Sequence, residues 1–401
     1  MSSTPQPIRG MQSLIGEEVD RFHAVVAAFD RVRRLYGFKR VEVPILESTA
    51  VFARTMGETT DVVSKEMYSF QDRSGDPVTM RPEFTAGIAR AYLSEGWQRF
   101  APLKVATHGP AFRYERPQKG RFRQFHQLDA EVLGSADPQS DVELLAFADQ
   151  LLRELGIGGV SLQLNTLGDG ASRDAWRTLL IDYFAAHRSE LSEDSQDRLE
   201  RNPLRILDSK DPRDRPFAEA APVMTLTAEA EDFFAQVRAG LDAAGVAYQL
   251  APHLVRGLDY YRHTAFEFVT DRLGAQGTVL AGGRYDGLIE QLGGAHTPAV
   301  GWAAGIERLS MLIDAPAPDS LDVAIVIEDD GRMADGWSAA SALRDAGLSV
   351  ELVASGSPRK RFDRAVKKGA AEIVVLGTQD GRPTRRIKAG GESRAQAVLG
   401  D

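Results

Sequence analysis

The sequence contains no cysteine. Disulfide bonds, thiolate nucleophiles and cysteine-ligated zinc are therefore excluded, and the composition is consistent with a reducing compartment. No stretch of about 18 apolar residues is present to span a bilayer. The N-terminal MSSTPQPIRGMQS also lacks the basic and apolar regions of a signal peptide. We therefore expect a cytoplasmic protein with no membrane partner.

Familiar metal-binding and nucleotide-binding motifs are also missing. The seven histidines show no HxxxH spacing, so we expect no histidine-ligated metal. Neither a GxxxxGK[ST] loop nor a GxGxxG turn after the first expected strand is present. If the protein binds phosphate, side chains rather than a backbone loop must hold it.

The 401-residue chain does have an ordinary globular composition, with 43% hydrophobic and 26% charged residues and a formal net charge of −9. That length predicts two or three domains. Two segments carry a net positive charge although the whole chain is negative. Residues 112–127 contain five Lys/Arg and one Glu, and residues 359–401 contain eleven Lys/Arg and five Asp/Glu. Each run is typical either of a solvated face or of a surface that binds a polyanion.

The N-terminal part predicts a helix followed by antiparallel strands. Apolar residues from Phe22 to Leu35 recur at helical spacing, and Gly37 follows as a stop signal. FKRVEVPIL then alternates as a strand up to Pro44, at a sheet edge or an interface. Residues 99–134 predict strand, turn, strand, long loop and strand. The loop RPQKGR is short enough to imply an antiparallel hairpin.

The rest of the chain predicts a helical insertion, a second β-rich segment and a small α/β tail. Helical periodicity covers 139–156, 171–190 and 227–244, and the polar, proline-punctuated stretch 190–225 shows no clear period. The runs HLVRGLDYY, TAFEFVT, GTVLAGG and AVGWAAG then predict strands, followed by a helix from Gly305. DAPAPDS is a linker, and a βαβαβ alternation follows it. The fold class is therefore α/β with an antiparallel core (α+β). The expected domain boundaries are 1–165 and 246–314 for the core, 166–245 for the insertion, 315–320 for the linker and 321–401 for the last domain.

Arginine recurs beside glycine or at a helix start in several strand-rich segments. That many guanidinium groups are too many for a packed core, so their convergence on one sheet would indicate an anionic ligand, above all a triphosphate. The residues concerned are Arg113, Arg256, Arg284 and Arg308.

One face of the strand RQFHQLDAE is mostly polar, which fits either a ligand site or a water-facing sheet. The period-two pattern places on this face Arg123, Phe125, Gln127, Asp129 and Glu131. In MRPEFTAG, Glu83 and Thr85 stand two positions apart at a helix start. An acidic residue that favours a helix N-terminus is the simpler interpretation of that segment taken alone.

Together these stretches resemble class II aminoacyl-tRNA synthetases, and specifically the bacterial histidyl-tRNA synthetase family, almost from end to end. RLYGFKRVEVPILE is similar to motif 1, GPAFRYERPQKGRFRQFHQLDAEVLG to motif 2 and GWAAGIERL to motif 3. LVRGLDYY and AGGRYDG are similar to the two histidine-specific signatures, which narrow the match to this family. The resemblance implies an antiparallel catalytic sheet flanked by helices, a helical insertion and a C-terminal α/β anticodon-binding domain.

The reaction implied by the resemblance joins histidine to tRNA in two steps. L-histidine and ATP first form histidyl-adenylate and pyrophosphate, and histidine then passes to the 3′ end of tRNA(His). The resemblance implies Arg256 and Arg113 as catalytic residues, because both would contact the α-phosphate. The ATP-binding residues implied by position are Arg113, Glu115, Arg121 and Arg308, with Glu115 near adenine or metal and Arg308 at the terminal phosphates.

The same resemblance assigns the amino acid and the tRNA acceptor end. The implied histidine ligands are Glu83, Thr85 and Gln127 for the α-amino group, Glu131 and Tyr261 for the imidazole with Tyr285 alongside, and Arg256 for the carboxylate. The implied acceptor-end residues are Arg116, Gln118 and Arg123. Mg²⁺ would be held mainly through the ATP phosphates, and motif 1 implies a homodimer.

Two departures from the family pattern accompany the resemblance. Phe84 stands where glycine is common in the family, at the floor of the amino-acid pocket. RRIKAGGESRAQAVLGD replaces the usual closing strand, turn and helix, so the last domain is expected to stop early.

Two other functions remain as alternatives. A non-catalytic paralogue would act as the regulatory subunit of ATP phosphoribosyltransferase in histidine biosynthesis. Such paralogues tend to lose the arginine of VRGLDYY and to lack the basic C-terminal domain, both of which this chain has. An RNA-binding structural protein would use only the basic hairpin, and the histidine-specific stretches would then have no purpose.

Overall fold

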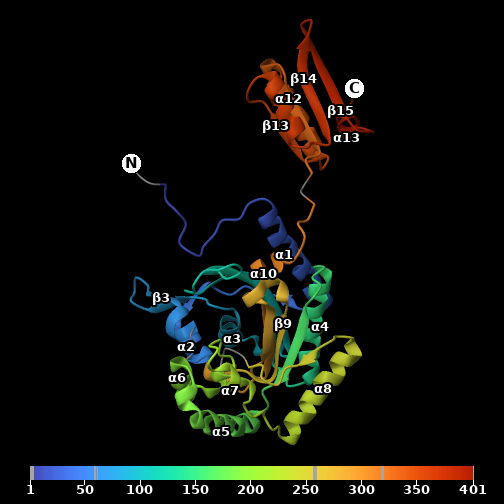
Figure 1. The fold of residues 1–401 in the computed structure, drawn as a ribbon. Coiled ribbons are helices and arrows are strands. Elements are labelled where there is room, and N and C mark those ends of the chain that lie inside the picture. The colour runs from blue at the N-terminus through green and yellow to red at the C-terminus, as the bar shows by residue number, and fades with distance from the viewer. Residues whose placement is uncertain (1–3, 58–59, 61, 256–259, 318–319, 401) are drawn as a thin grey trace. The chain divides into compact units, whose positions relative to one another are not determined.

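The computed structural model describes residues 4–57, 60, 62–255, 260–317 and 320–400. The chain divides into two compact units, Met1–Pro316 and Ala317–Asp401. Figure 1 traces both units along the chain. None of the described helices is long and apolar enough to cross a bilayer.

The first unit is built on a mainly antiparallel sheet, as the sequence predicts. Its strands, in spatial order, are β1 (Lys39–Arg40), β5 (Leu103–Phe112), β6 (Gln124–Leu133), β11 (Ala299–Gly305), β10 (Thr278–Arg284), β9 (Arg262–Val269), β7 (Ser161–Thr166) and β8 (Gln249–Leu250). The two outermost pairs, β1 with β5 and β7 with β8, are parallel. The central strands pair antiparallel, so residues far apart in sequence lie on neighbouring strands.

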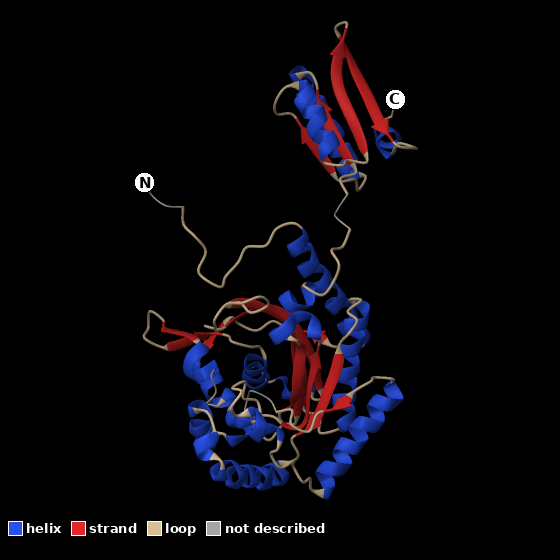
Figure 2. Ribbon diagram, in the orientation of Figure 1, coloured by secondary structure: helices blue, strands red, loops and turns tan. Residues whose placement is uncertain are grey.

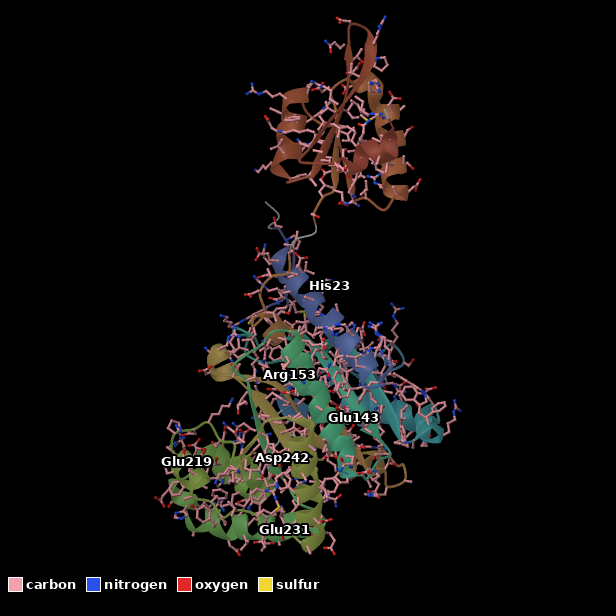
Figure 3. All side chains as sticks on the ribbon, turned by 90° about the vertical axis from the view of Figure 1, so that its right-hand side faces the viewer. His23, Glu143, Arg153, Glu219, Glu231 and Asp242 are labelled. Carbon is pink, nitrogen blue, oxygen red and sulfur yellow. The ribbon has the colours of Figure 1, made fainter. Side chains whose placement is uncertain are left out.

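One face of this sheet is covered by helices whose apolar stripes pack on it. These helices are α1 (Glu17–Leu35), α4 (Pro138–Glu154), α8 (Ala228–Ala244) and α10 (Ile306–Ser310). The predicted first helix is confirmed, with Val25, Phe29 and Val32 buried and Gly37 at a φ of +71° after its end. Figure 2 shows the strands between the helices. Figure 3 shows that α4 also carries charged side chains, such as Glu143 and Arg153.

The opposite face carries α3 (Thr85–Ser94), α9 (Leu288–Gln291) and the helical insertion. The insertion contains α5 (Gly170–Ala186), α6 (Glu193–Arg201), a 3-10 turn (Pro203–Ile206) and α7 (Arg215–Glu219). Trp176, Leu180 and Phe184 of α5 are buried against apolar residues of this turn and of the core. A small side sheet of β2 (Leu46–Ser48), β4 (Pro77–Met80) and β3 (Tyr68–Gln71) adjoins α2 (Thr49–Met56).

Three strand predictions were wrong in detail. The turn expected near Gly109 and Pro110 is absent, because β5 runs unbroken from Leu103 to Phe112. The two-residue β1 pairs only with Val105 and Ala106, so Pro110 lies on an edge of the sheet that tolerates a missing N–H. FKRVEVPIL forms only the short β1 before β2 begins at Leu46. In the run HLVRGLDYY, residues 253–255 are not a strand, and β9 begins only at Arg262.

The second unit is the predicted α/β domain, a sheet with helices on both faces. Its strands are β13 (Val350–Val353), β12 (Val323–Ile327), β14 (Glu372–Gln379) and β15 (Arg382–Ala389) in spatial order, and its helices are α11 (Met333–Asp345), α12 (Pro358–Lys367) and α13 (Arg394–Leu399). The side chains of β12 alternate between two apolar clusters, Val323, Ile325 and Ile327 in one and Ala324 and Val326 in the other. Such a strand is buried on both faces.

The expectation that this domain stops early was wrong. β15 pairs antiparallel with β14 along its whole length, and α13 follows it. Ser393 caps α13 by accepting a hydrogen bond from the backbone N–H of Gln396, and Ala395 is fully buried in the domain core. Residues 385–400 therefore form a strand, a turn and a helix despite their polar composition.

Candidate active site

A cavity of about 370 Å³ opens on the sheet face that carries the odd-numbered residues of β6. The even-numbered Leu128, Ala130 and Val132 point the other way, into the core beneath α1 and α4. The alternation predicted for this strand is therefore present. Of the residues proposed from the sequence, those that line the cavity are Glu83, Thr85, Arg113, Glu115, Arg121, Gln127, Tyr261 and Arg308. Arg256 lies outside the described residues.

Glu131 forms a fully buried carboxyl beneath the cavity. Its Oε1 accepts a hydrogen bond of 2.6 Å from the hydroxyl of Thr85, and its Oε2 accepts one from the hydroxyl of Tyr285. Burial raises the pKa of Glu131 to about 8, although both hydrogen bonds act in the opposite direction. Burial therefore favours the protonated form of this carboxyl.

Glu83 holds the start of α3 and also lines the cavity. Its two carboxylate oxygens accept hydrogen bonds of 2.8 Å from the backbone N–H groups of Thr85 and Ala86. Capping of the helix N-terminus, the simpler interpretation of this segment, is thus correct. Burial raises the pKa of Glu83 above its ordinary value, against the effect of those hydrogen bonds. The same side chain lines the cavity, so capping and substrate contact are compatible roles.

Asp129 is a buried acid that lies between Gln127 and Glu131 on the site face of β6. Its side chain is fully buried, and neither carboxyl oxygen has a hydrogen-bond partner in the part of the chain that the structure describes. Thr107, directly opposite on β5, has an unpartnered buried hydroxyl as well. Burial, followed by the nearby charges of Glu131 and Glu83, raises the pKa of Asp129 well above its usual range. The sequence placed Asp129 on this face but gave it no role.

Three tyrosines form an aromatic wall next to these acids. The rings of Tyr260 and Tyr261 lie with centroids 4.5 Å apart, and Tyr285 meets Tyr260 edge to face at 5.6 Å. Burial raises the pKa of Tyr285 well above its ordinary value, so its hydroxyl stays protonated and donates to Glu131. The wall is therefore apolar in its body and polar where it meets the acids.

Arginines occupy the other end of the cavity. Along β11, Gly301 pairs with Glu131 and Gly305 with Gln127, and Arg308 follows in α10. The Nε of Arg308 donates to the carbonyl of Gly120 at 3.0 Å, and its Nη1 donates to the carbonyl of Thr278 at 2.7 Å. These bonds fix the guanidinium between the β5–β6 loop and β10, at the opposite end of β11 from Glu131.

Arg113 and Arg121 reach the cavity from the loop between β5 and β6. Arg113 Nε donates to the carbonyl of Pro82 at 3.0 Å, and its guanidinium lies 5.4 Å from the ring centroid of Phe125. Arg121 forms an ion pair with Glu115. Burial lowers the pKa of Arg113 and of Arg308, and the charges of Arg121 and Arg113 lower the pKa of Arg308 further. The ordinary pKa of arginine lies so far above neutral pH that both side chains remain cationic.

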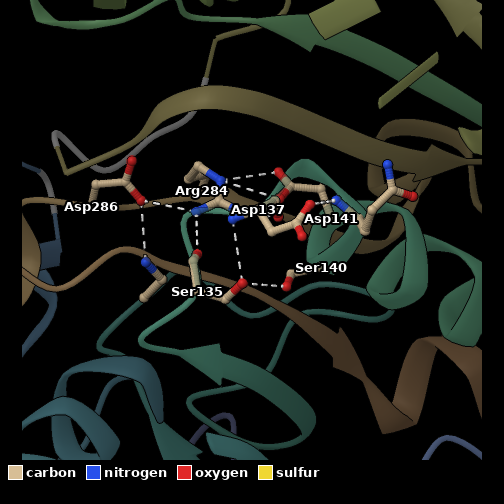
Figure 4. Close-up of polar contacts among 8 residues, drawn as sticks. Ser135, Asp137, Ser140, Asp141, Arg284 and Asp286 are labelled. Carbon is tan, nitrogen blue, oxygen red and sulfur yellow. Dashed lines mark hydrogen bonds and ion pairs between the residues drawn. The ribbon is translucent and has the colours of Figure 1, made fainter. Parts of the chain in front are cut away.

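Arg284, expected to converge with the other arginines, does not reach the cavity. It is fully buried and pairs with Asp141 at the start of α4, where Figure 4 shows its contacts. Its Nη1 also donates to the carbonyl of Ser135 at 2.8 Å and to Asp286 at 3.2 Å. Because Arg284 and Tyr285 are neighbours in the chain, their side chains leave the backbone in different directions, and Tyr285 is the one that contacts Glu131.

The three residues expected to meet a tRNA acceptor end lie in the loop between β5 and β6. Arg116 and Gln118 are exposed, and the backbone of Gln118 forms two hydrogen bonds with that of Arg121. Arg123 folds back instead: its guanidinium lies 3.7 Å from the ring centroid of Tyr114 and donates to the carbonyl of Glu115. Arg116 and Gln118 are thus free to meet a partner, whereas Arg123 shapes the base of the loop.

Several residues that line the cavity were not predicted from the sequence. Glu307 accepts hydrogen bonds from the backbone N–H of His126 and contacts its Nδ1 at 2.8 Å. Its position beside Arg308 in the first turn of α10 could have suggested it. Lys210 comes from the insertion, where no periodicity marked it. The remaining additions include Phe122, Glu267 and Thr278.

An antiparallel sheet of this kind, with a cavity that has acids and phenols at one end and arginines at the other, defines the catalytic core of a class II aminoacyl-tRNA synthetase. A family model described as histidyl-tRNA synthetase matches residues 10–169 and 185–309. The chain belongs to the histidyl-tRNA synthetase family and is therefore an enzyme of the aminoacyl-tRNA synthetase class.

Individual relatives agree with this assignment over nearly the whole chain. The histidine–tRNA ligase of Novosphingobium aromaticivorans is 67% identical, over 96% of this chain and 94% of that protein. The ligase of Gluconobacter oxydans is 53% identical, over 94% of this chain and 91% of that protein. The structure of apo histidyl-tRNA synthetase from S. aureus has a TM-score of 0.77 at 30% identity and covers 96% of this chain and 97% of that one. These matches favour the catalytic enzyme over the regulatory paralogue.

Proposed function

We propose that this chain activates L-histidine with ATP and transfers it to the 3′ end of tRNA(His), and that both steps take place in the cavity above β6 and β11. The observation that carries this proposal is the arrangement along β11. Glu131 lies beside Gly301, and Arg308 follows Gly305 at the other end of the strand, about 13 Å away along β11 at the usual rise per residue. One amino acid joined to a nucleotide phosphate fits such a span.

Histidine would occupy the acidic end. Glu83, Thr85 and Gln127 offer oxygen acceptors to its α-ammonium group. Glu131 and Tyr261 would face the imidazole, while Tyr285 holds Glu131 in place through its hydrogen bond. A carboxyl with a pKa of about 8 can give a proton to an imidazole nitrogen or accept one from it near neutral pH. Polar groups that are buried and left unpaired by other amino acids would reject them strongly.

ATP would occupy the cationic end. Arg113 would bind the α-phosphate and Arg308 the terminal phosphates, with Arg121 and Glu115 beside them. The carboxylate of histidine attacks the α-phosphorus, a new P–O bond forms and pyrophosphate leaves with the electrons of the broken bond. Fixed guanidinium groups stabilise the negative charge that develops on the phosphorus and on the leaving group. Arg256, in the segment between β8 and β9, would contact both the carboxylate and the α-phosphate.

Mg²⁺ is part of this proposal, and the chemistry of the cavity fits it. Glu115, Glu267 and Glu307 supply the hard oxygen donors that Mg²⁺ prefers. In the described ranges no group of three or more His, Cys, Asp or Glu is arranged to hold a metal. The ion would therefore be held mainly by the ATP phosphates with one or two of these carboxylates, and would neutralise phosphate charge when bound.

The second step requires tRNA(His). We expect the enzyme to be a homodimer and to act in the cytoplasm. Arg116, Gln118 and Arg123 are proposed to meet the acceptor end, and the second unit to bind the anticodon. The basic strand β15, with Arg382, Arg385, Arg386 and Lys388 among its eight residues, supports the anticodon role through attraction to phosphate.

Histidine-dependent ATP–pyrophosphate exchange with Mg²⁺, measured against all twenty amino acids, tests the proposal. Exchange that depends on histidine alone is the expected result. Histidine binding without exchange would instead assign the chain to the regulatory, non-catalytic function. Salt-sensitive RNA binding without histidine binding would leave only the RNA-binding role of the basic hairpin.

A further inference from the structure

Lys210 brings a positive charge into the cavity from outside the catalytic sheet. It lies between α6 and α7 in the insertion, and it lines the same cavity as Arg113 and Arg308. Its side chain is exposed and forms no ion pair or hydrogen bond with any residue that the structure describes. The three arginines of the cavity, in contrast, are each held by a carbonyl or a carboxylate.

The surroundings of Lys210 argue against a structural role for its charge. Glu83, Glu115, Glu267 and Glu307 all line this cavity, so a lysine that served only to balance charge would pair with one of them. None of them does so with Lys210. An ammonium group that faces a cavity and has all three of its N–H donors free is suited to an anionic ligand.

The loop that carries Lys210 is held in place by hydrogen bonds to a buried carboxylate. Asp214 is fully buried and accepts four hydrogen bonds: 2.7 Å from the backbone N–H of Ser192, 2.7 Å from its hydroxyl, 2.6 Å from the hydroxyl of Ser195 and 2.5 Å from that of Ser209. Burial alone would raise the pKa of Asp214, but these hydrogen bonds outweigh it and lower the pKa. Asp214 is therefore an ionised acceptor that ties the residue before Lys210 to the start of α6.

Lys210 also lies where the insertion meets the chain that returns to the sheet. Together with His253 it lines a neighbouring hollow of about 410 Å³, and together with Tyr260 it lines the cavity itself. The arginines reach the cavity from the β5–β6 loop and from α10, which are different parts of the chain. A phosphate in the cavity would thus be contacted by cations from the sheet and from the insertion.

We propose that Lys210 binds the phosphates of ATP during adenylate formation, as a catalytic cation supplied by the insertion. This inference rests on the proposed function. In this step the histidine carboxylate forms the bond to the α-phosphorus, and pyrophosphate leaves with the electron pair of the broken P–O bond. A compact charge on a flexible stem can follow the phosphates as they move, which a guanidinium held by two carbonyls cannot.

The test is ATP–pyrophosphate exchange without tRNA, on the full-length enzyme. Lys210→Met keeps the length of the side chain and removes its charge, and Lys210→Arg restores a charge. Arg213→Ala is the matched control, because Arg213 is exposed in the same loop and, among the described residues, forms its ion pair with Asp211 alone. We expect Lys210→Met to lower kcat/KM for ATP by roughly 10- to 100-fold, the effect of one charged hydrogen bond. Lys210→Arg should recover most of it, and Arg213→Ala should match the wild type.

The outcomes separate this inference from the proposed function. If the wild type shows no histidine-dependent exchange, the proposed function fails, whatever Lys210 does. If the wild type is active and Lys210→Met exchanges normally, the inference is overturned. A loss confined to tRNA charging would also overturn it, because Lys210 would then serve the nucleic acid and not ATP.

Asp214 is a positioning residue in this scheme, and a double mutant tests that role. Asp214→Asn should lower kcat/KM for ATP in the wild-type background while histidine binding, measured by calorimetry without ATP, stays the same. In the Lys210→Met background the same change should have little further effect, because Asp214 acts through Lys210. Equal losses in both backgrounds would show that Asp214 only stabilises the insertion.

Discussion

Gly301 and Glu131 face each other across neighbouring strands so closely that no side chain can stand between them. A Cβ built on Gly301 would lie 1.4 Å from Oε2 of Glu131. The two residues are register partners in the pairing of β11 with β6. Glycine at 301 therefore makes room for the carboxyl that Thr85 and Tyr285 hold by hydrogen bonds.

Gly301→Ala should abolish histidine activation. The added methyl group would displace Glu131 from Thr85 and Tyr285 and leave buried polar groups without partners. We expect histidine-dependent exchange to fall by at least about 100-fold, and the free energy of unfolding by about 1–3 kcal/mol. Gly287→Ala is the control, since a Cβ on Gly287 would meet nothing within 4 Å. Normal exchange in Gly301→Ala would remove Glu131 from the histidine site.

Glu131 should make the stability of the ligand-free protein depend on pH. Its pKa rises from 4.5 in the unfolded chain to about 8 in the folded protein because burial disfavours the charged form. The stabilisation is fully present below pH 4.5 and is lost as pH rises through about 8, because the folded state retains a proton that the unfolded state releases. Over this pH range the unfolding free energy of Glu131→Gln should therefore fall by a few kcal/mol less than that of the wild type. Urea unfolding at several pH values measures it, and equal slopes in the two proteins would contradict the assignment.

Asp141 and Arg284 form a fully buried ion pair away from the cavity, so they should affect stability more than chemistry. Asp141→Ala leaves the guanidinium of Arg284 buried with only part of its partners, and we expect a loss of about 3–5 kcal/mol in unfolding free energy. At temperatures where the variant is folded, histidine-dependent exchange should persist. Chemical denaturation and exchange assays on the same sample separate the two effects.

The matched control for that variant lies on the same helix. Arg153 pairs with Asp149 at 2.8 Å, and its side chain is 69% exposed. Arg153→Ala should therefore cost less than about 1 kcal/mol. If Arg153→Ala and Asp141→Ala destabilise the protein equally, burial does not determine the strength of these pairs.

Removal of the second unit should separate the two steps of the reaction. Residues 1–316 form a compact unit that contains every cavity residue, so a chain that ends at Pro316 should keep histidine-dependent exchange. Charging of tRNA should become much less efficient because the basic β15 is lost. Aminoacylation at a fixed tRNA concentration provides the measurement, and unchanged charging would remove the anticodon role from residues 317–401.

Local sequence patterns predicted helices and strands well where one hydrophobic period dominated. They predicted strands less well where pairing with a distant strand decides whether a segment is a strand. The periodicity of α1 and the alternation of β6 were sufficient because one face of each is buried. The strand through Pro110 was missed, since only its place at a sheet edge makes proline acceptable there. The closing strand β15 was missed because its polar sequence becomes a strand through eight backbone partners on β14.

The sequence by itself determined the α/β class, the family resemblance and eight of the residues that line the cavity, because these depend on residue types at short and regular spacings. Only the tertiary structure decided how side chains are used. It turned Arg284 into the core while Tyr285 contacts Glu131, and it left Asp129 buried with no hydrogen-bond partner among the residues that the structure describes. It also brought Lys210 from an aperiodic insertion to the cavity that Arg113 and Arg308 line. Such placements depend on contacts between segments far apart in the chain, about which local spacing carries no information.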